Sequence, residues 1–325
     1  MTSHLPSSPA QCESFRFSAS SMDQLNSTGV ISNLSSPHGL SSLVSLDSSS
    51  LVAVVVVLSF CFLLGVPGNL AVIILRPNWQ HLSSLSQILM LNLAVSDTLC
   101  LLTLPLWNYS LLYNWIFGQE ACKLLAYLIY CCLYGSLLTV TVLSVLRYLQ
   151  VVHLHKFFNE VGKKRLLLVL WLVAMILSIP ALVIRKPVKG QHKTLCQPQY
   201  SSEAQSVAVL LSESMVGLVS FSVLAFAYTC LHRKVNQTAF FNHPKTTRLV
   251  TSIIVTFFVL WMPHVIVNVL YVVAISLEHE GLLKFCVDSK DIVGALPFVN
   301  SCLNPLLYAF ASRNLCTLCQ KTEDK

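Results

Sequence analysis

The chain has 325 residues, of which 54% are hydrophobic and only 11% are charged. Soluble domains carry roughly twice that charged share, so the composition excludes an ordinary soluble protein, which would not stay dissolved. The formal net charge is +7. Its distribution along the chain, described below, indicates contact with anionic membrane lipids and not binding of nucleic acid.

Seven long apolar stretches explain this composition, and each has the roughly 20 residues that a helix needs to cross a bilayer. They are Leu51–Leu75, Leu82–Trp107, Leu124–Leu146, Leu166–Ile184, Ala204–Leu231, Leu249–Leu277 and Ile292–Ser312. The sequence therefore predicts an all-α membrane protein, a seven-transmembrane helix bundle over residues 51–309. Residues 1–50 precede the bundle and residues 310–325 follow it.

The lysines and arginines between these stretches predict the orientation of the chain. With the N-terminus outside, the inner segments hold thirteen cations and three acids, whereas the outer segments hold eight cations and nine acids. Positively charged connections stay on the cytoplasmic side of a membrane. We therefore expect a multi-pass protein of the plasma membrane with an extracellular N-terminus.

Both ends of the chain carry candidate modification sites. The N-terminal tail is rich in serine and has no hydrophobic period, which predicts a disordered extracellular segment. Asn26 and Asn33 each begin a glycosylation sequence in it. Residues 310–315 predict a short interfacial eighth helix, and Cys316 and Cys319 beside it are candidates for palmitoylation.

Several polar residues interrupt the apolar stretches. Asp97 lies far from either end of the second stretch and its side chain is short, so we expect it to face a hydrated bundle interior. Asn300, Asn304 and Tyr308 are four residues apart, which places them on one helix face, toward the bundle. Pro263 frees a backbone carbonyl in the sixth stretch and predicts a bend there.

Several motifs resemble the signature set of rhodopsin-like G-protein-coupled receptors, in the same order, along residues 51–316. They are Gly68-Asn69, Leu93–Asp97, Cys122 with Cys196, Arg147-Tyr148, Trp171, Trp261-Met-Pro263 and Asn304-Pro305-Leu-Leu-Tyr308. The resemblance implies a receptor that activates a heterotrimeric G protein and is not an enzyme. The alternative class is a transporter or channel. Against it, we find no inverted repeat and only two intramembrane acids, Asp97 and Glu213, which is few for an ion relay.

The resemblance also implies a disulfide and an ion pocket. A Cys122–Cys196 bond would tie the second outer loop to the top of the third helix. The pocket would hold an allosteric sodium ion, the only cofactor that we expect, because hard oxygen ligands around a carboxylate suit a small cation. Its members would be Asp97, Ser136, Asn300 and Asn304. A hydrogen-bonded cluster without an ion is the alternative.

An inner activation switch is implied as well. Its members would be Arg147, Tyr228, Trp261, Pro263, Asn304, Pro305 and Tyr308. The chain departs from the family pattern at Leu146, where an acid normally precedes the arginine. Arg147 therefore lacks its usual counter-charge, and we expect measurable signalling without ligand.

The second outer loop predicts the ligand class. It is strongly basic and contains Arg185, Lys186, Lys189 and Lys193. We expect these cations to lie over an apolar cavity lined by Tyr127, Tyr130, Tyr134 and Trp261. Such a site suits an anionic lipid, because the acid pairs with a cation while each buried methylene contributes about 0.8 kcal/mol. The alternative is that the loop cations are only solvated surface.

Local motifs resemble leukotriene B4 receptors. They are the segment Cys196–Glu203, Glu213, and the segment Trp261–Asn268. The resemblance implies that Arg185, Glu213 and Asn268 recognise the carboxylate and hydroxyls of such a lipid, and that the G protein belongs to the inhibitory class.

Other ligands stay open at this point. The chain has Ala126 and Ser206 where leukotriene B4 receptors have a histidine and an arginine, so a different oxidised fatty acid is one alternative. A receptor for a chemokine or another chemoattractant peptide is the other. The long tail and a second outer cysteine pair, Cys12 with Cys286, would argue for it, but residues 1–50 contain no tyrosine.

Overall fold

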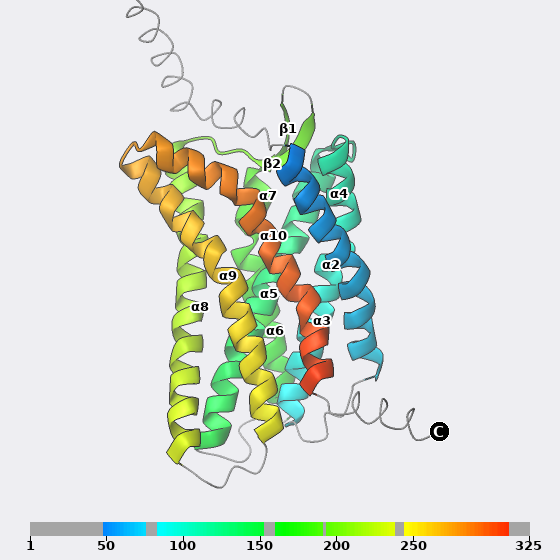
Figure 1. The fold of residues 1–325 in the computed structure, drawn as a ribbon, viewed down its shortest axis with the longest axis vertical. Helices are drawn as coiled ribbons and strands as arrows, with labels where there is room; N and C mark the ends of the chain where they lie inside the picture. Colours follow the sequence, from blue (N-terminus) through cyan, green and yellow to red (C-terminus); the bar gives the residue numbers. More distant parts are fainter. Residues whose placement is uncertain (1–47, 76–82, 153–159, 191–192, 238–243, 312–325) are drawn as a thin grey trace, which may run out of the picture.

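The computed structural model describes residues 48–75, 83–152, 160–190, 193–237 and 244–311. The elements are α2 (Ser48–Leu75), α3 (Ser84–Leu102), α4 (Leu104–Leu112), α5 (Gly118–Val152), α6 (Glu160–Leu177), α7 (Ile179–Ile184), β1 (Arg185–Lys189), β2 (Thr194–Pro198), α8 (Glu203–Gln237), α9 (Pro244–Ser276) and α10 (Glu280–Ala311). The described chain is thus almost entirely helical (Figure 1).

Six segments of the described chain are long and apolar enough to cross a membrane, and they match the first six predicted stretches. They are Leu51–Leu75, Ser84–Leu112, Gly118–Leu146, Gly162–Ile184, Glu203–Cys230 and Thr251–Ser276. The seventh predicted stretch lies in α10 as far as Ala311, and the first half of α10 also carries charged residues. The predicted seven-helix bundle is confirmed, whereas the eighth helix and Cys316 and Cys319 fall almost wholly on residues outside the described ranges, as do Asn26 and Asn33.

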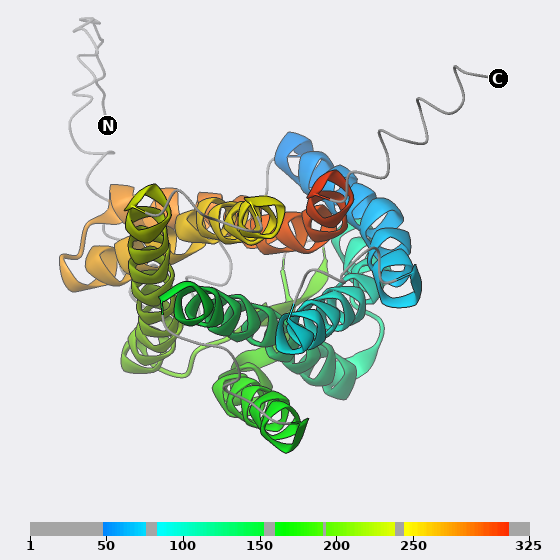
Figure 2. The same cartoon turned by 90° about the horizontal axis from the view of Figure 1, so that it is seen from below.

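The helices form a ring that Figure 2 shows end-on. Helix α2 packs between α3 and α10, α9 lies between α10 and α8, and α5 contacts both α8 and α3. Helix α6 lies outside this ring and packs against α5. In the apolar window of α5, 61% of the residues are buried, against 28% in α2 and in the α6–α7 span. Helix α5 is therefore an inner helix, while α2 and α6 turn apolar faces to lipid.

Two spans contain a break next to a proline. Helix α3 ends at Leu102, and α4 begins one residue later with a proline in its first turn. Helix α6 ends at Leu177, and α7 begins after Ser178, again with a proline in its first turn. A proline lacks the backbone N–H that would continue the preceding helix, but it fits a new first turn. Each span is therefore divided into two helices near the same end of the bundle.

Small residues let α2 and α10 approach closely, as membrane helix pairs require. A Cβ atom on Gly68 would lie only 2.9 Å from Cβ of Pro305, and one on Gly65 would lie 3.1 Å from Cα of Cys302. The side chain of Asn69 uses this proximity, because its Nδ2 donates to the carbonyl of Ser301 at 3.0 Å. The predicted Gly68-Asn69 motif thus fixes the α2–α10 contact.

The expected second outer loop contains a short β-hairpin, which an all-α expectation did not include. Strands β1 and β2 are antiparallel, with Arg185 opposite Pro198 and Pro187 opposite Cys196. The hairpin lies across the top of the bundle in Figure 1, and we call this end of the molecule the hairpin end. The hairpin satisfies its own backbone groups, which a structureless loop over a cavity would not do.

Candidate ligand-binding site

A disulfide fixes the hairpin to the bundle. Cys122 in α5 and Cys196 in β2 are bonded, with their Cα atoms 5.7 Å apart, so the predicted pair is confirmed. The backbone N–H of Trp115 also donates to the carbonyl of Thr194 at 2.8 Å. These two links hold the first residue of β1, Arg185, at the mouth of the bundle.

A cavity of about 670 Å³ opens below the hairpin, within the range of small-molecule sites. Its apolar wall comes from α2, α4, α5, α9 and α10. Members of this wall are Val54, Leu58, Leu104, Trp107, Ile129, Leu133, Leu137, Trp261, Val265, Ala295 and Phe298. The predicted cavity residues Tyr130, Tyr134 and Trp261 all line it. The volume and the wall suit an elongated apolar group.

Arg185 is the cation that faces this cavity. Its Nη1 donates to the carbonyl of Cys196 at 3.3 Å, and its guanidinium carbon lies 6.0 Å from the ring centre of Tyr130. The Nε atom is buried and has no hydrogen-bond partner among the residues that the structure describes. Arg185 therefore has donor capacity left, at the edge of an apolar cavity.

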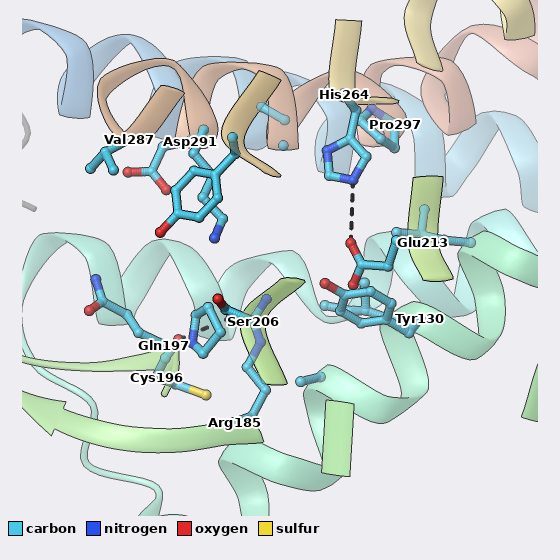
Figure 3. A pocket seen from close by; sticks show the side chains of 18 of the residues that line it. Tyr130, Arg185, Cys196, Gln197, Ser206, Glu213, His264, Val287, Asp291 and Pro297 are labelled. Atoms are coloured by element: carbon cyan, nitrogen blue, oxygen red, sulfur yellow. Dashed lines mark hydrogen bonds and ion pairs between the residues drawn. The ribbon is translucent and has the colours of Figure 1, made fainter. Parts of the chain in front are cut away.

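A polar cluster lies deeper, between α8 and α9. Glu213 and His264 line the cavity, and their Oε2 and Nε2 atoms are 4.0 Å apart (Figure 3). Asn268 Nδ2 lies 3.2 Å from Oε2 of Glu213, to which it donates, and 3.3 Å from Nε2 of His264. Figure 3 shows Glu213 beside Tyr130 as well. The glutamate is therefore held in place by its neighbours.

Two residues predicted to bind ligand do not line the cavity. Tyr127 lies one helical turn before Tyr130 in α5, but its hydroxyl donates to the carbonyl of Met175 in α6 at 3.3 Å. Asn268 is buried behind Glu213, so it positions that carboxylate and does not border the cavity. The expectation that Tyr127 lines the cavity is wrong, because its side chain turns toward α6.

The expectation that four loop cations lie over the cavity holds for one residue. Of the four loop cations, Arg185 alone lines the cavity. The ammonium of Lys193 instead binds the carbonyls of Leu111 and Leu112, at 3.2 and 2.9 Å, which are acceptors at the C-terminus of α4. Lys189 is exposed at the tip of β1. A hairpin alternates the direction of its side chains, so it cannot turn all four cations inward.

The cavity includes charged residues that sequence reasoning missed. Lys290 and Asp291 line it from α10, and Glu203, Glu278 and Glu280 line it near the hairpin end. Ala126 and Ser206 border it as well. The signal in the sequence is the set of charges directly before the predicted stretch Ile292–Ser312, which belongs to α10 and not to a loop.

The predicted ion pocket lies farther from the hairpin. Asp97 is fully buried, and its Oδ1 accepts from the hydroxyl of Ser136 at 3.1 Å. Asn304 Nδ2 donates to Oδ2 at 2.6 Å. Asn300 is buried one residue before Ser301, and its Oδ1 has no partner in the described part of the chain. Ser301, which was not predicted, takes its place and donates to Oδ1 at 2.8 Å.

The switch residues are described only in part. The ring of Trp261 stacks on Phe257, with ring centres 5.2 Å apart, at the floor of the cavity. Pro263 and Pro305 lie inside α9 and α10. Tyr228 is half-buried on α8. The side chains of Arg147 and Tyr308 lie outside what the structure describes, so the switch itself stays a prediction.

The second cysteine pair has one described member. Cys286 is a buried free thiol on α10, packed near Tyr271 and Leu210, while Cys12 lies outside the described residues. Their pairing stays a prediction.

Comparison with known proteins agrees with this architecture. Residues 68–308 match the family described as 7 transmembrane receptor (rhodopsin family). The type-1 angiotensin II receptor B of Rattus norvegicus is 29% identical over 278 residues, which cover 78% of this chain and 76% of the receptor. The C-X-C chemokine receptor type 2 of Mus musculus is 28% identical over 272 residues, which cover 79% of this chain and 74% of the receptor.

The type-1 angiotensin II receptor of Meriones unguiculatus is 30% identical over 278 residues, covering 78% of this chain and 76% of that receptor. These relatives are receptors and not enzymes, transporters or channels. A closeness to leukotriene B4 receptors is not among these findings. The family match spans most of the helical bundle, and the chain belongs to the rhodopsin family of seven-transmembrane receptors.

Proposed function

We propose that this receptor binds an amphipathic anionic ligand, with leukotriene B4 as the chemical example, from outside the plasma membrane. In response it activates a heterotrimeric G protein of the inhibitory class, in signalling of the chemoattractant type. The observation that carries the proposal is Arg185, a cation at the cavity edge with a buried and unpartnered Nε.

The shape of the cavity supports an acid with a long apolar chain. A carboxylate on Arg185 would gain a charge-assisted hydrogen bond worth about 1.5–3 kcal/mol. The chain would then run along the wall formed by Leu133, Leu137 and Phe298, where each buried methylene contributes about 0.8 kcal/mol. Glu213 and His264 offer hydrogen-bond partners to hydroxyl groups on that chain.

The floor of the cavity gives a route to activation. Trp261 borders the cavity and stacks on Phe257, both on α9. A ligand that displaces Trp261 would act on α9 two residues before Pro263, where the helix lacks one backbone hydrogen bond. Movement of α9 would then reach the inner switch that the family resemblance implies. A ligand stabilises this state only by binding it more tightly than the resting one.

An allosteric sodium ion at Asp97 is part of the proposal. The residues fit such an ion, because Oδ1 of Asn300 and Oδ1 of Asn304 are buried and unpartnered in the described chain. Together with the carboxylate of Asp97 and the hydroxyl of Ser136 they form a set of hard oxygen ligands. When bound, the ion would supply positive charge that favours the resting packing of α3 against α10.

A peptide receptor is the second candidate, and a specific observation favours it. Glu203, Glu278 and Glu280 border the cavity at the hairpin end and are exposed, so they would complement a basic peptide. The relatives' names, angiotensin II receptor and C-X-C chemokine receptor, also denote peptide or protein ligands.

Signalling in cells separates the two candidates. Inhibition of cAMP formation would be measured in cells that express the receptor, after addition of leukotriene B4, its methyl ester, angiotensin II or a C-X-C chemokine. We expect a response to the acid, a weaker one to the ester and loss of both after pertussis toxin. A response to a peptide and to no lipid would replace the proposal with the second candidate.

A further inference from the structure

A second cation faces the cavity that contains Arg185. Lys290 lines the cavity from α10. Figure 3 labels Asp291, which directly follows Lys290, and shows it on the wall opposite Arg185. Arg185 and Lys290 therefore present two like charges to the same cavity. Like charges that face one cavity raise each other's energy unless an anion lies between them.

Neither cation has a short-range carboxylate partner. Arg185 donates to the carbonyl of Cys196 and lies against the ring of Tyr130. The Nζ of Lys290 lies 5.7 Å from the ring centre of Tyr271. Among the described residues, no carboxylate oxygen lies within 4.0 Å of either cation. The ion pair that lines the cavity joins His264 and Glu213. Both cations therefore retain capacity for a direct anion contact.

Two acids compensate these cations from a longer distance. Asp291 interacts electrostatically with both Lys290 and Arg185. Glu213 also faces them, but Asn268 donates a hydrogen bond to its carboxylate at 3.2 Å. Asp291 has no such hydrogen bond among the described contacts, so it is the free internal counter-ion of the two cations.

We propose that Arg185 and Lys290 together form the acid-binding subsite of this receptor, and that Asp291 is the carboxylate with which the ligand's acid competes. The proposal rests on the proposed function and makes Lys290 a specificity-determining residue. A carboxylate has two oxygens, so each cation receives one of them. The ligand's acid group then lies between β1 and α10, and its chain extends toward Trp261.

The test uses the full-length receptor in cell membranes, with variants matched for surface expression and leukotriene B4 and its methyl ester as probes. Lys290→Gln should weaken binding of the acid about tenfold, the effect of losing one charge-assisted hydrogen bond, and leave binding of the ester unchanged. Lys290→Arg should retain the preference for the acid. Lys284→Gln is the matched control, because Lys284 is exposed on the same helix and does not line the cavity.

Asp291→Asn gives a second test, in which the expected result is a gain in affinity that a misfolded variant would not show. Removal of the competing carboxylate should strengthen binding of the acid several-fold and leave the ester unchanged. Weaker or unchanged binding of the acid by Asp291→Asn would overturn the inference, because Asp291 would then not compete with the ligand's acid for the two cations.

The remaining outcomes separate this inference from the proposed function. If Arg185→Gln abolishes the preference for acid over ester while Lys290→Gln leaves it intact, the two-cation subsite is wrong and the proposed function stands. If neither substitution changes the preference, or if no acidic lipid acts on the unmodified receptor, both are overturned.

Discussion

The bundle contains two clusters of charged and polar side chains, and they differ in how their charges are satisfied. Asp97 is fully buried, and both of its carboxylate oxygens accept hydrogen bonds from Ser136, Ser301 and Asn304. Arg185, in contrast, donates to one carbonyl and has an unpartnered Nε within the described chain. The carboxylate of Asp97 is satisfied by its protein neighbours, whereas Arg185 retains donor capacity for an anion.

This difference separates a structural role from a recognition role. The donors around Asp97 come from α5 and α10, so the cluster connects three helices and sets their packing. Arg185 lies on a hairpin that is fixed by one disulfide, next to a cavity of about 670 Å³. A buried charge is costly unless it is paired, so an incomplete site beside a cavity indicates a ligand. The predictions below act on one cluster and leave the other unchanged.

The largest effect is expected from the disulfide. Cys122→Ser or Cys196→Ser should lower stability by about 2–4 kcal/mol and abolish ligand binding, because the hairpin no longer holds Arg185 at the cavity. Thermal unfolding in detergent and ligand binding to membranes measure the two effects. Stabilisation by sodium at the Asp97 cluster should persist in both variants. Unchanged binding in both variants at full surface expression would contradict the account.

A smaller effect is expected at Asp97. Asp97→Ala leaves three donors without their acceptor and should cost about 2 kcal/mol, since a hydrogen bond between membrane helices is worth about 0.6 kcal/mol on average. Thermal unfolding with sodium or with choline chloride measures it. Sodium should stabilise the unmodified receptor but neither Asp97→Ala nor Asp97→Asn, while the preference for an acidic ligand should not change. An equal sodium effect in all three proteins would exclude an ion at this cluster.

The smallest effect concerns signalling without ligand. Leu146, which stands in place of the usual acid, is buried in the main core of the bundle. Leu146→Asp should stabilise the resting state by about 1–2 kcal/mol and lower ligand-free GTPγS exchange about five- to thirty-fold. Leu146→Asn, which is polar but uncharged, is the control for burial. Equal exchange rates in the two variants at matched surface expression would show that the charge has no such role.

The fold was predictable because its signal is long and repeated. Each apolar stretch has roughly the 20 residues that a helix needs to cross a bilayer, and the chain has few ways to satisfy its backbone in lipid other than helices. The pairing of Cys122 with Cys196 came from the family resemblance and is confirmed. The hairpin was missed because Arg185–Lys189 is charged and contains a proline, and the contacts that hold it, the disulfide and the hydrogen bond from Trp115, join residues far apart in the sequence.

The site was less predictable because side-chain direction depends on packing. Arg185 and Glu213 were found, but Tyr127 points to α6, and three loop lysines do not reach the cavity. Lys290 was missed because charged residues directly before an apolar stretch are typical of a loop, whereas α10 begins at Glu280 and Lys290 lines the cavity. Residue type and spacing thus identified the walls but not which charges face the ligand.

The central claim is that Arg185 binds an acid group, and one ratio tests it most directly. The measurement is the affinity of leukotriene B4 divided by that of its methyl ester, in membranes with the unmodified receptor, Arg185→Gln, or the control Lys189→Gln on the same hairpin. The account predicts that Arg185→Gln lowers this ratio at least tenfold, corresponding to about 1.5–3 kcal/mol, by weakening the acid alone. Equal losses for acid and ester in Arg185→Gln would contradict it, because Arg185 would then act on folding and not on recognition.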